Sequence, residues 1–305
     1  MKIIVVGLGV QGNKRKKFAR KDFVGSVDPK NKKANFKTIK EVPLESYDAA
    51  LLCVPDNQKR KILEFCLKNK KHVLLEKPLS LNESNLKKIQ KKANKQNIIF
   101  YTAYNHRFEP HLKKIKDIIN SKKLGKIYSC RIFYGNGTAK LVYKTWRDRK
   151  KGVISDIGSH LLDICLFLFG KKAYDFKFKL NSFHSFENIS PDHAVISSDN
   201  KDIYTELEMT YCMWKNHFSF DLIAKNGSVH IDSLCKWGPS TLTYRKRIFP
   251  SGKPKEHKII LRKSDPTWAL EYKKFKQLIK NKKKTNFFND LWIQKQINHI
   301  KKKST

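Results

Sequence analysis

The sequence predicts an α/β protein with an N-terminal doubly wound parallel sheet and a C-terminal α+β domain with a large open, mostly antiparallel sheet. Up to about residue 101, short apolar runs alternate with helical stretches, as in parallel strands joined by crossover helices. Beyond about Gly125, strand-like segments dominate. The chain has 305 residues, enough for two domains of roughly 100–200 residues each. We therefore expect domains at 1–124 and 125–305.

The N-terminal elements follow from the apolar pattern. Residues 3–6 are apolar throughout, which is typical of a strand buried on both faces. Ser80 and Glu83 have the spacing of a capping box, which predicts a helix that starts there. The other elements expected in this domain are strands at 23–28, 49–54, 72–75 and 98–101 and a helix at 59–69.

The C-terminal half predicts a sheet interrupted by one strongly apolar helix at about 155–169, with two helices at 268–281 and 289–302. We expect strands at 126–134, 174–180, 194–197, 204–211, 218–224, 228–231 and 257–261.

The charge of the chain is strongly positive. Lys and Arg number 65 against 27 acids, a net charge of +38, and only ten of the 65 are arginines. The lysines are spread along the chain and lie mostly on the polar sides of expected helices, which favours a solvated surface over a nucleic-acid site. We expect no specific nucleic-acid partner, although non-specific affinity for polyanions remains an alternative. The electrostatic field of this positive charge would steer an anionic substrate toward the protein.

Other features indicate a cytoplasmic protein without a membrane partner. No apolar run approaches the roughly 20 residues that a membrane helix needs, and the N-terminus has no secretory cleavage pattern. The six cysteines form no CxxC pair, so we expect free thiols and no metal site.

A glycine turn, Gly7-x-Gly9-x-x-Gly12, follows the first strand and opens a helix. Asp28 comes twenty-one residues after Gly7, at the end of the second expected strand. This context predicts a dinucleotide site of the Rossmann type, in which the second glycine lets the backbone approach a pyrophosphate. Asp28 would bind ribose hydroxyls and repel a 2′-phosphate, which favours NAD. NADP remains an alternative because lysines follow at 30, 32 and 33.

The apolar helix carries three ionisable residues. Asp156, His160 and Asp163 have i, i+4, i+7 spacing, so they share one stripe of a helix whose other faces are apolar. Buried charges of this kind need a cavity or one another. A carboxylate one turn before an imidazole can fix its tautomer, as acid–base catalysis requires. The alternatives are an N-capping Asp156 and a His160 satisfied in the core.

The segment Glu76-Lys77-Pro78 ends a central strand, at the edge where wound sheets bind ligands. Proline favours an extended residue before it, so the Lys77 ammonium could point across a crevice toward the helix at 155–169. One lysine among 55 is weak evidence by itself.

Together these residues resemble the glucose–fructose oxidoreductase / inositol dehydrogenase / rhizopine catabolism (Gfo/Idh/MocA) superfamily of NAD(P)-dependent oxidoreductases. The matching pieces, in order, are Gly7-x-Gly9-x-x-Gly12, Val54-Pro55-Asp56-Asn57, Leu75-Glu76-Lys77-Pro78-Leu79, Tyr104-Asn105-His106-Arg107-Phe108-x-Pro110, Trp146-Arg147 and Gly152-x-x-x-Asp156-x-Gly158-x-His160-x-x-Asp163. One departure is Lys59, where many relatives have a histidine.

The resemblance implies a role for each matching residue. The expected catalytic residues are Lys77, Asp156 and His160. The expected cofactor contacts are Gly7, Gly9, Val10, Gln11, Gly12, Asp28, Val54, Pro55, Asn57, Glu76, Lys77, Asn105, Trp146 and Arg147. The expected substrate contacts are Lys77, Arg107, Tyr134, Asp156 and His160.

The function expected is an NAD(H)-dependent oxidoreductase that transfers a hydride to or from a secondary hydroxyl or ketone carbon of a sugar, cyclic polyol or nucleotide-linked sugar. The substrate is expected to be small, with an anionic one as an alternative. The resemblance implies that residues 1–124 form the NAD(P)-binding domain and residues 125–305 the substrate-binding and oligomerisation domain. By resemblance, the chain forms a homodimer or homotetramer through the exposed face of its large sheet. The alternative function is a non-catalytic NAD-binding regulatory or scaffold protein.

Overall fold

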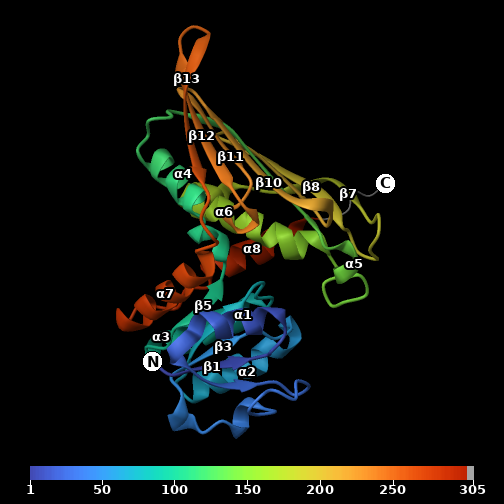
Figure 1. The fold of residues 1–305 in the computed structure, drawn as a ribbon, viewed down its shortest axis with the longest axis vertical. Helices are drawn as coiled ribbons and strands as arrows, with labels where there is room; N and C mark the ends of the chain where they lie inside the picture. Colours follow the sequence, from blue (N-terminus) through green and yellow to red (C-terminus); the bar gives the residue numbers. More distant parts are fainter. Residues whose placement is uncertain (301–305) are drawn as a thin grey trace. The chain divides into compact units, whose positions relative to one another are not determined.

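The computed structural model describes residues 1–300 and divides the chain into two compact units (Figure 1). Unit 1 comprises Met1–Asn105 and Thr267–Leu291, and unit 2 comprises His106–Pro266 and the chain from Trp292 onward. Unit 2 thus begins at His106, Thr267–Leu291 returns to unit 1, and the expected domain boundary after residue 124 stays a prediction. Residues 301–305, which end the expected second domain and its last helix, lie outside the described residues. The assignment of one domain to cofactor and one to substrate stays a prediction.

Unit 1 is built on a five-stranded sheet in the order β2-β1-β3-β4-β5, in which every pair of neighbours is parallel. The expected doubly wound sheet is confirmed. Its strands are β1 (Ile3–Val6), β2 (Phe23–Val27), β3 (Ala49–Leu52), β4 (His72–Glu76) and β5 (Phe100–Ala103), and its helices are α1 (Val10–Ala19), α2 (Asp56–Lys68), α3 (Glu83–Lys95) and α7 (Thr267–Lys280).

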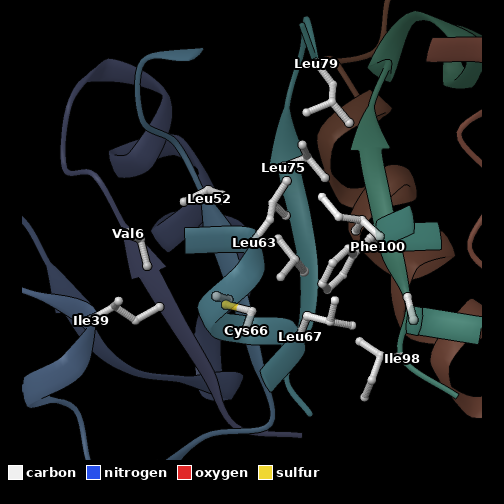
Figure 2. Close-up of a cluster of buried hydrophobic side chains, with 14 of the residues drawn as sticks. Val6, Ile39, Leu52, Leu63, Cys66, Leu67, Leu75, Leu79, Ile98 and Phe100 are labelled. Carbon is white, nitrogen blue, oxygen red and sulfur yellow. The ribbon is translucent and has the colours of Figure 1, made fainter. Parts of the chain in front are cut away.

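The core of unit 1 lies on both faces of this sheet, as the apolar strands predict. Alternate residues of β1 enter different clusters: Ile4 and Val6 pack on one side, Ile3 and Val5 on the other. Figure 2 shows the first cluster, where Leu63 and other side chains of α2 pack against the sheet. Because both faces of the sheet are covered, all four residues of β1 are buried.

Unit 2 contains an eight-stranded sheet in the order β13-β12-β11-β10-β6-β9-β8-β7, in which only the pair β6 and β9 is parallel among the described strands. The expected open, mostly antiparallel sheet is confirmed. Its strands are β6 (Ile127–Gly137), β7 (Lys179–His184), β8 (His193–Asp199), β9 (Tyr204–Thr210), β10 (Cys212–Ala224), β11 (Gly227–Asp232), β12 (Ser240–Ile248) and β13 (Gly252–Leu261).

The helices of unit 2 cover one face of this sheet (Figure 1). The packing between helix and sheet is close at Gly158, where a Cβ atom would lie 2.9 Å from the sulfur of Met209 on β9. The helices are α4 (Pro110–Asn120), α5 (Ala139–Val142), α6 (Ser159–Phe169) and the part of α8 (Phe288–His299) that follows Leu291. Short helical turns occur at η4 (Asn105–Phe108), η5 (Ile154–Gly158), η6 (Gly170–Asp175) and η7 (Cys235–Trp237).

Three local expectations are wrong. The strand expected at 174–180 begins only at Lys179, because Gly170–Asp175 forms a 3-10 turn after α6. Ser240–Ile248 forms a strand that its polar sequence does not reveal, since the outer half of this strand is exposed. The N-cap of α3 is Asn82, whose side chain accepts a hydrogen bond from the Asn85 N–H, instead of Ser80.

Among the described residues, no helix combines the length and the apolar composition that a membrane crossing requires.

Candidate active site

The glycine turn of unit 1 leaves open space at only one of its three glycines. A Cβ on Gly7, whose φ is +92°, would lie 2.5 Å from the Cys53 carbonyl oxygen, and a Cβ on Gly12 would lie 1.8 Å from the Gly7 oxygen. A Cβ on Gly9 would meet nothing within 4 Å. Gly9 precedes α1, whose first turn has no acidic residue and no side-chain cap. This is the geometry in which the free N–H groups of a helix N-terminus bind a phosphate.

Asp28 closes the same turn from the end of β2. One carboxylate oxygen accepts the Leu8 N–H at 2.8 Å, and the other accepts the N–H groups of Lys30 and Asn31 at 2.8 and 2.9 Å. Burial raises the pKa of Asp28, but these backbone bonds outweigh it and hold the pKa below its usual value. The side chain is thus an oriented anion beside the open space at Gly9. A dinucleotide with free ribose hydroxyls fits this arrangement.

Lys77 directly follows β4, and a buried lysine braces its turn. Lys59, only 2% exposed, donates from Nζ to the Glu76 carbonyl oxygen at 2.6 Å and also to the Pro78 carbonyl oxygen. Its ammonium lies 3.3 Å from an Asp56 carboxylate oxygen. Burial lowers the pKa of Lys59, and Asp56 opposes that effect. The residue that departs from the family pattern therefore holds the carbonyls on both sides of Lys77.

The carboxylate of Glu76 is held by a second buried cation. Arg15 of α1 donates from Nε to Glu76 at 2.8 Å and pairs with Glu271 of α7 at 2.7 Å. Burial disfavours the charge of Arg15, but the two carboxylates outweigh it and raise its pKa. Glu76, expected to contact the cofactor, thus anchors the end of β4 to α1 and α7.

The remaining cofactor candidates of unit 1 lie at element boundaries. Val10 is 73% exposed at the start of α1, next to an exposed Gln11. Val54 and Pro55 link β3 to α2, with Asn57 exposed in the first turn of α2. Asn105 donates to the Thr267 hydroxyl at 2.9 Å. Their contacts with a cofactor stay predictions.

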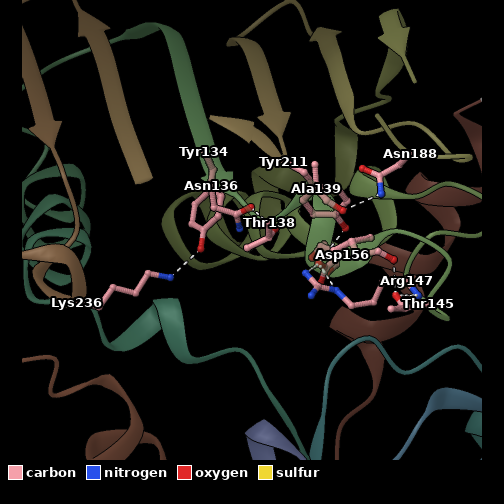
Figure 3. A network of polar contacts seen from close by, with 12 residues as sticks. Tyr134, Asn136, Thr138, Ala139, Thr145, Arg147, Asp156, Asn188, Tyr211 and Lys236 are labelled. Carbon is pink, nitrogen blue, oxygen red and sulfur yellow. Dashed lines mark hydrogen bonds and ion pairs between the residues drawn. The ribbon is translucent and has the colours of Figure 1, made fainter. Parts of the chain in front are cut away.

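In unit 2, Asp156 lies in a π-helical turn, η5, that precedes α6. Arg147 donates to its Oδ2 from Nε at 2.9 Å, and the buried Tyr211 hydroxyl donates to the same oxygen at 3.0 Å (Figure 3). Desolvation and the Asp156 charge raise the pKa of Tyr211 well above its usual value, so the hydroxyl stays a donor. Turns of this type occur often at functional sites.

His160 contacts a second histidine of unit 2. Its Nδ1 lies 3.0 Å from Nδ1 of His106, and the two ring centroids are 4.2 Å apart. His106 thus lies at Nδ1 of His160, and the expected role of Asp156 in fixing the tautomer of His160 stays a prediction. The π-helical turn also changes the angular position of Asp156 relative to the helix that carries His160.

Asp163 belongs to the core of unit 2. Its side chain is buried, and Arg107 donates to it from Nε at 2.7 Å and from a second guanidinium nitrogen. Desolvation raises the pKa of Asp163, and the Arg107 charge opposes that effect. The third member of the expected stripe thus pairs with Arg107, which we expected to contact substrate.

Tyr134 of β6 is buried, and its ring packs edge-on against His106 with centroids 5.6 Å apart. Lys236 donates from Nζ to the Tyr134 hydroxyl at 2.7 Å, as Figure 3 shows, and lies over the Trp237 ring. Trp146, in the loop before Arg147, is 52% exposed.

Of the three residues expected to move protons, Lys77 belongs to unit 1, and Asp156 and His160 belong to unit 2. Their joint action on one substrate stays a prediction. Across the described part of the chain, His, Cys, Asp and Glu form no group of three suited to a metal ion.

Several residues of these hydrogen-bond and ion-pair networks were not predicted from the sequence. His106 and Tyr211 could have been suspected, since His106 lies inside a family motif and Tyr211 ends an expected strand. Lys236 and Arg15 carry no comparable signal, because they are two of 65 basic residues. Lys59 stands out as a departure from the family pattern, but that departure does not predict which carbonyls it binds.

The oriented carboxylate and open glycine turn of unit 1 define a dinucleotide-binding domain. Residues 1–104 match the family model described as an oxidoreductase family with an NAD-binding Rossmann fold, and residues 112–230 match the GFO/IDH/MocA C-terminal domain. The chain therefore belongs to the Gfo/Idh/MocA family, and unit 1 contains its NAD-binding Rossmann domain.

Individual relatives agree with this family. Myo-inositol 2-dehydrogenase of Thermotoga maritima is 36% identical over 85 residues, which are 28% of this chain and 25% of that protein. Glucose-6-phosphate 3-dehydrogenase of Bacillus subtilis is 25% identical over 201 residues, 62% of this chain and 53% of that protein. The chain thus spans a quarter to about half of these curated relatives.

A solved structure extends the likeness in fold to nearly the whole chain. Levoglucosan dehydrogenase in complex with NADH and levoglucosan has a TM-score of 0.79 at 15% identity, covering 98% of this chain and 96% of that one.

Proposed function

We propose that the protein is an NAD(H)-dependent oxidoreductase that acts on a secondary hydroxyl or ketone of a sugar, cyclic polyol or nucleotide-linked sugar. Family membership supports the NAD part of this proposal. The observation that carries the catalytic part is the hydrogen bond between the Nδ1 atoms of His160 and His106 at 3.0 Å. We assign the proton exchange with substrate to Nε2, the other nitrogen of this partly exposed imidazole.

The residues of unit 1 have binding roles in this proposal. Backbone N–H groups at Gly9 and in the first turn of α1 bind the pyrophosphate. Asp28 accepts hydrogen bonds from the hydroxyls of the adenosine ribose. Because Asp28 is an oriented anion, a 2′-phosphate would be repelled, which supports NAD over NADP. When bound, NAD supplies the hydride acceptor or donor at its nicotinamide ring.

Oxidation of a secondary alcohol to a ketone releases one hydride and one proton. In our proposal, Nε2 of His160 takes the proton from the hydroxyl, and the Lys77 ammonium stabilises the developing alkoxide. Asp156, fixed by Arg147 and Tyr211, provides an oriented acceptor for a second hydroxyl of the substrate. In the reverse direction His160 returns the proton to the carbonyl oxygen.

The substrate class is inferred from the names of the relatives, which act on inositol and on glucose 6-phosphate. The net charge of +38 would raise the encounter rate of an anionic sugar. The six cysteines are free thiols, which supports a cytoplasmic setting. A homodimer or homotetramer remains part of the proposal.

The test starts from the purified protein. Mass spectrometry of the nucleotide that it releases should identify NAD or NADH. A panel of sugars, polyols and nucleotide-linked sugars is then followed at the NADH absorbance. We expect turnover with at least one member of the panel and at least a hundredfold loss of kcat in His160→Ala, with NADH affinity nearly unchanged. Equal turnover in that variant would contradict the assignment. Tight NADH binding without turnover on any substrate would favour the non-catalytic NAD-binding alternative.

A further inference from the structure

Two histidines of unit 2 face each other through the same type of ring nitrogen. Nδ1 of His106 and Nδ1 of His160 lie 3.0 Å apart, which is a hydrogen-bond distance. A neutral imidazole carries its proton on one nitrogen only. The contact is therefore a hydrogen bond only if one ring holds its proton on Nδ1 and the other holds it on Nε2.

The surroundings fix the position of His106 more firmly than that of His160. His106 is only 5% exposed, whereas His160 is partly exposed on α6. The ring of Tyr134, on the buried face of the sheet, packs edge-on against the His106 ring. Lys236 of η7 in turn donates to the Tyr134 hydroxyl. Contacts with the sheet thus position His106, and His106 in turn contacts the partly exposed ring of His160.

The charged groups around the pair come from several elements, and the acids are held by arginines. On α6, Asp163 is bound by Arg107 of η4, the residue that follows His106. In η5, Asp156 is bound by Arg147. The cation nearest to Tyr134 in the hydrogen-bond network is Lys236. The Nδ1 partner of His160 is a second imidazole, and it occupies a place where a carboxylate would raise the basicity of His160.

We propose that His106 is a positioning residue that sets the tautomer of His160 and accepts the Nδ1 proton when His160 is charged. This inference rests on the proposed function and assigns it a second histidine. When Nε2 of His160 takes the hydroxyl proton, its Nδ1–H donates to the lone pair of His106 Nδ1. That proton can pass to His106, so the positive charge is shared by two rings and no carboxylate is needed.

The first test needs no variant and no substrate. The full-length protein, labelled with ¹⁵N-histidine, is examined by NMR at a pH where both rings are neutral. We expect one of the two rings to be protonated at Nδ1 and the other at Nε2. If both rings carry their proton on Nε2, no proton lies between the Nδ1 atoms and the proposal is overturned.

The second test uses substitutions at His106 with matched chemistry. His106→Asp gives His160 a charged acceptor, and we expect the midpoint of the His160 titration to rise by at least about one pH unit. His106→Asn offers a neutral acceptor and should retain most of the turnover. His106→Phe removes the acceptor and should lower kcat at least tenfold, while KM for NADH changes less than twofold. An equal titration midpoint in wild type and His106→Asp overturns the proposal.

The matched control is His111, a buried histidine of α4 whose Nε2 lies 3.1 Å from the Ser240 carbonyl oxygen. His111→Asn should leave the His160 titration and the pH profile of turnover unchanged, because this ring does not contact His160. Coupled titration without turnover on any sugar would leave the histidine pair standing and reject the proposed function. Turnover that depends on His160, with a His160 titration that does not respond to substitutions at His106, would support the proposed function and reject the role of His106.

Discussion

The ammonium nitrogen of Lys59 lies 2.6 Å from the carbonyl oxygen of Glu76, deep in unit 1. The same nitrogen donates to the Pro78 carbonyl, so the carbonyl groups of both residues that flank Lys77 are bound by one buried cation. Asp56 supplies the nearby negative charge. The position of Lys77 is thus set by a residue on α2 that touches neither cofactor nor substrate in our proposal.

Lys59→Met should lower both stability and activity. The variant keeps the length of the side chain but leaves two partly buried carbonyl groups without their donor, which costs at most about 1–3 kcal/mol each. We expect a loss of this order in the free energy of unfolding, measured by urea denaturation, together with a lower kcat because the turn around Lys77 loosens. Lys61→Met, at an exposed position on the same helix, should change neither quantity. Wild-type stability in Lys59→Met would show that the hydrogen bonds from Lys59 to the Glu76 and Pro78 carbonyls do not stabilise the fold.

Substitutions at two glycines of one turn should affect different properties: Gly9→Ala should lower NADH affinity, and Gly12→Ala should lower stability. Gly9→Ala places a methyl group in the space assigned to the pyrophosphate, so NADH affinity should fall at least tenfold while the melting temperature stays within a few degrees. Gly12→Ala forces a Cβ to 1.8 Å from the Gly7 oxygen, so this variant should lose stability. Fluorescence titration with NADH and thermal melting measure the two effects. Unchanged NADH affinity in Gly9→Ala would place the dinucleotide elsewhere.

The buried pair of Arg107 and Asp163 should matter more than an exposed pair of the same type. Arg107→Met leaves a buried carboxylate unpaired and should cost about 3–5 kcal/mol of unfolding free energy. Arg131→Met breaks a contact of 3.8 Å with Glu206, made by an arginine whose side chain is 65% exposed, and should cost at most about 1 kcal/mol.

A double variant tests the same pair by another route. Arg107→Met combined with Asp163→Leu removes both charges, so denaturation should show that it recovers most of the stability lost in Arg107→Met. If the two substitutions destabilise independently, the charge pairing is not the reason for the loss.

Asp28 predicts a specific dependence of stability on pH. Its pKa in the folded protein lies below the value of about 3.9 for an unfolded aspartate. Its contribution to stability is therefore fully present above pH ~4 and is lost as the pH falls through the folded pKa. Asp28→Asn should be less stable than wild type at pH 7 by about 1 kcal/mol, and the difference should shrink below pH ~4. Denaturation from pH 7 to pH 3 measures it, with the exposed Asp202→Asn as control; a constant difference over this range would contradict the shift.

The features that sequence analysis could predict depend on local patterns. Residues 3–6 predicted a strand buried on both faces because every side chain is apolar, and the glycine turn predicted the open space at Gly9 because it follows that strand. The large sheet was also predictable from its runs of strand-like segments. Ser240–Ile248 was not, because an exposed outer strand carries few apolar residues to mark it.

The networks around the candidate site depend on contacts distant in the sequence. Arg15 reaches Glu271, and His160 pairs with His106, across separations that no periodic pattern encodes. The π-helical turn that carries Asp156 was equally hidden, since a 3.6-residue period was the natural reading of a helical sequence. Residue identity suggested which side chains handle protons, but only tertiary structure could show their partners.

The claim on which the account depends is that Lys77 and His160 serve one hydroxyl group of the substrate. The most direct measurement is a double-mutant cycle on kcat, with Lys77→Met, His160→Ala and the double variant, each with its NADH affinity determined. Residues that act as a unit lose activity non-additively. We predict that the double variant is little slower than the slower single variant, with NADH still bound. Losses that multiply, or a wild-type rate in either single variant, would contradict the claim.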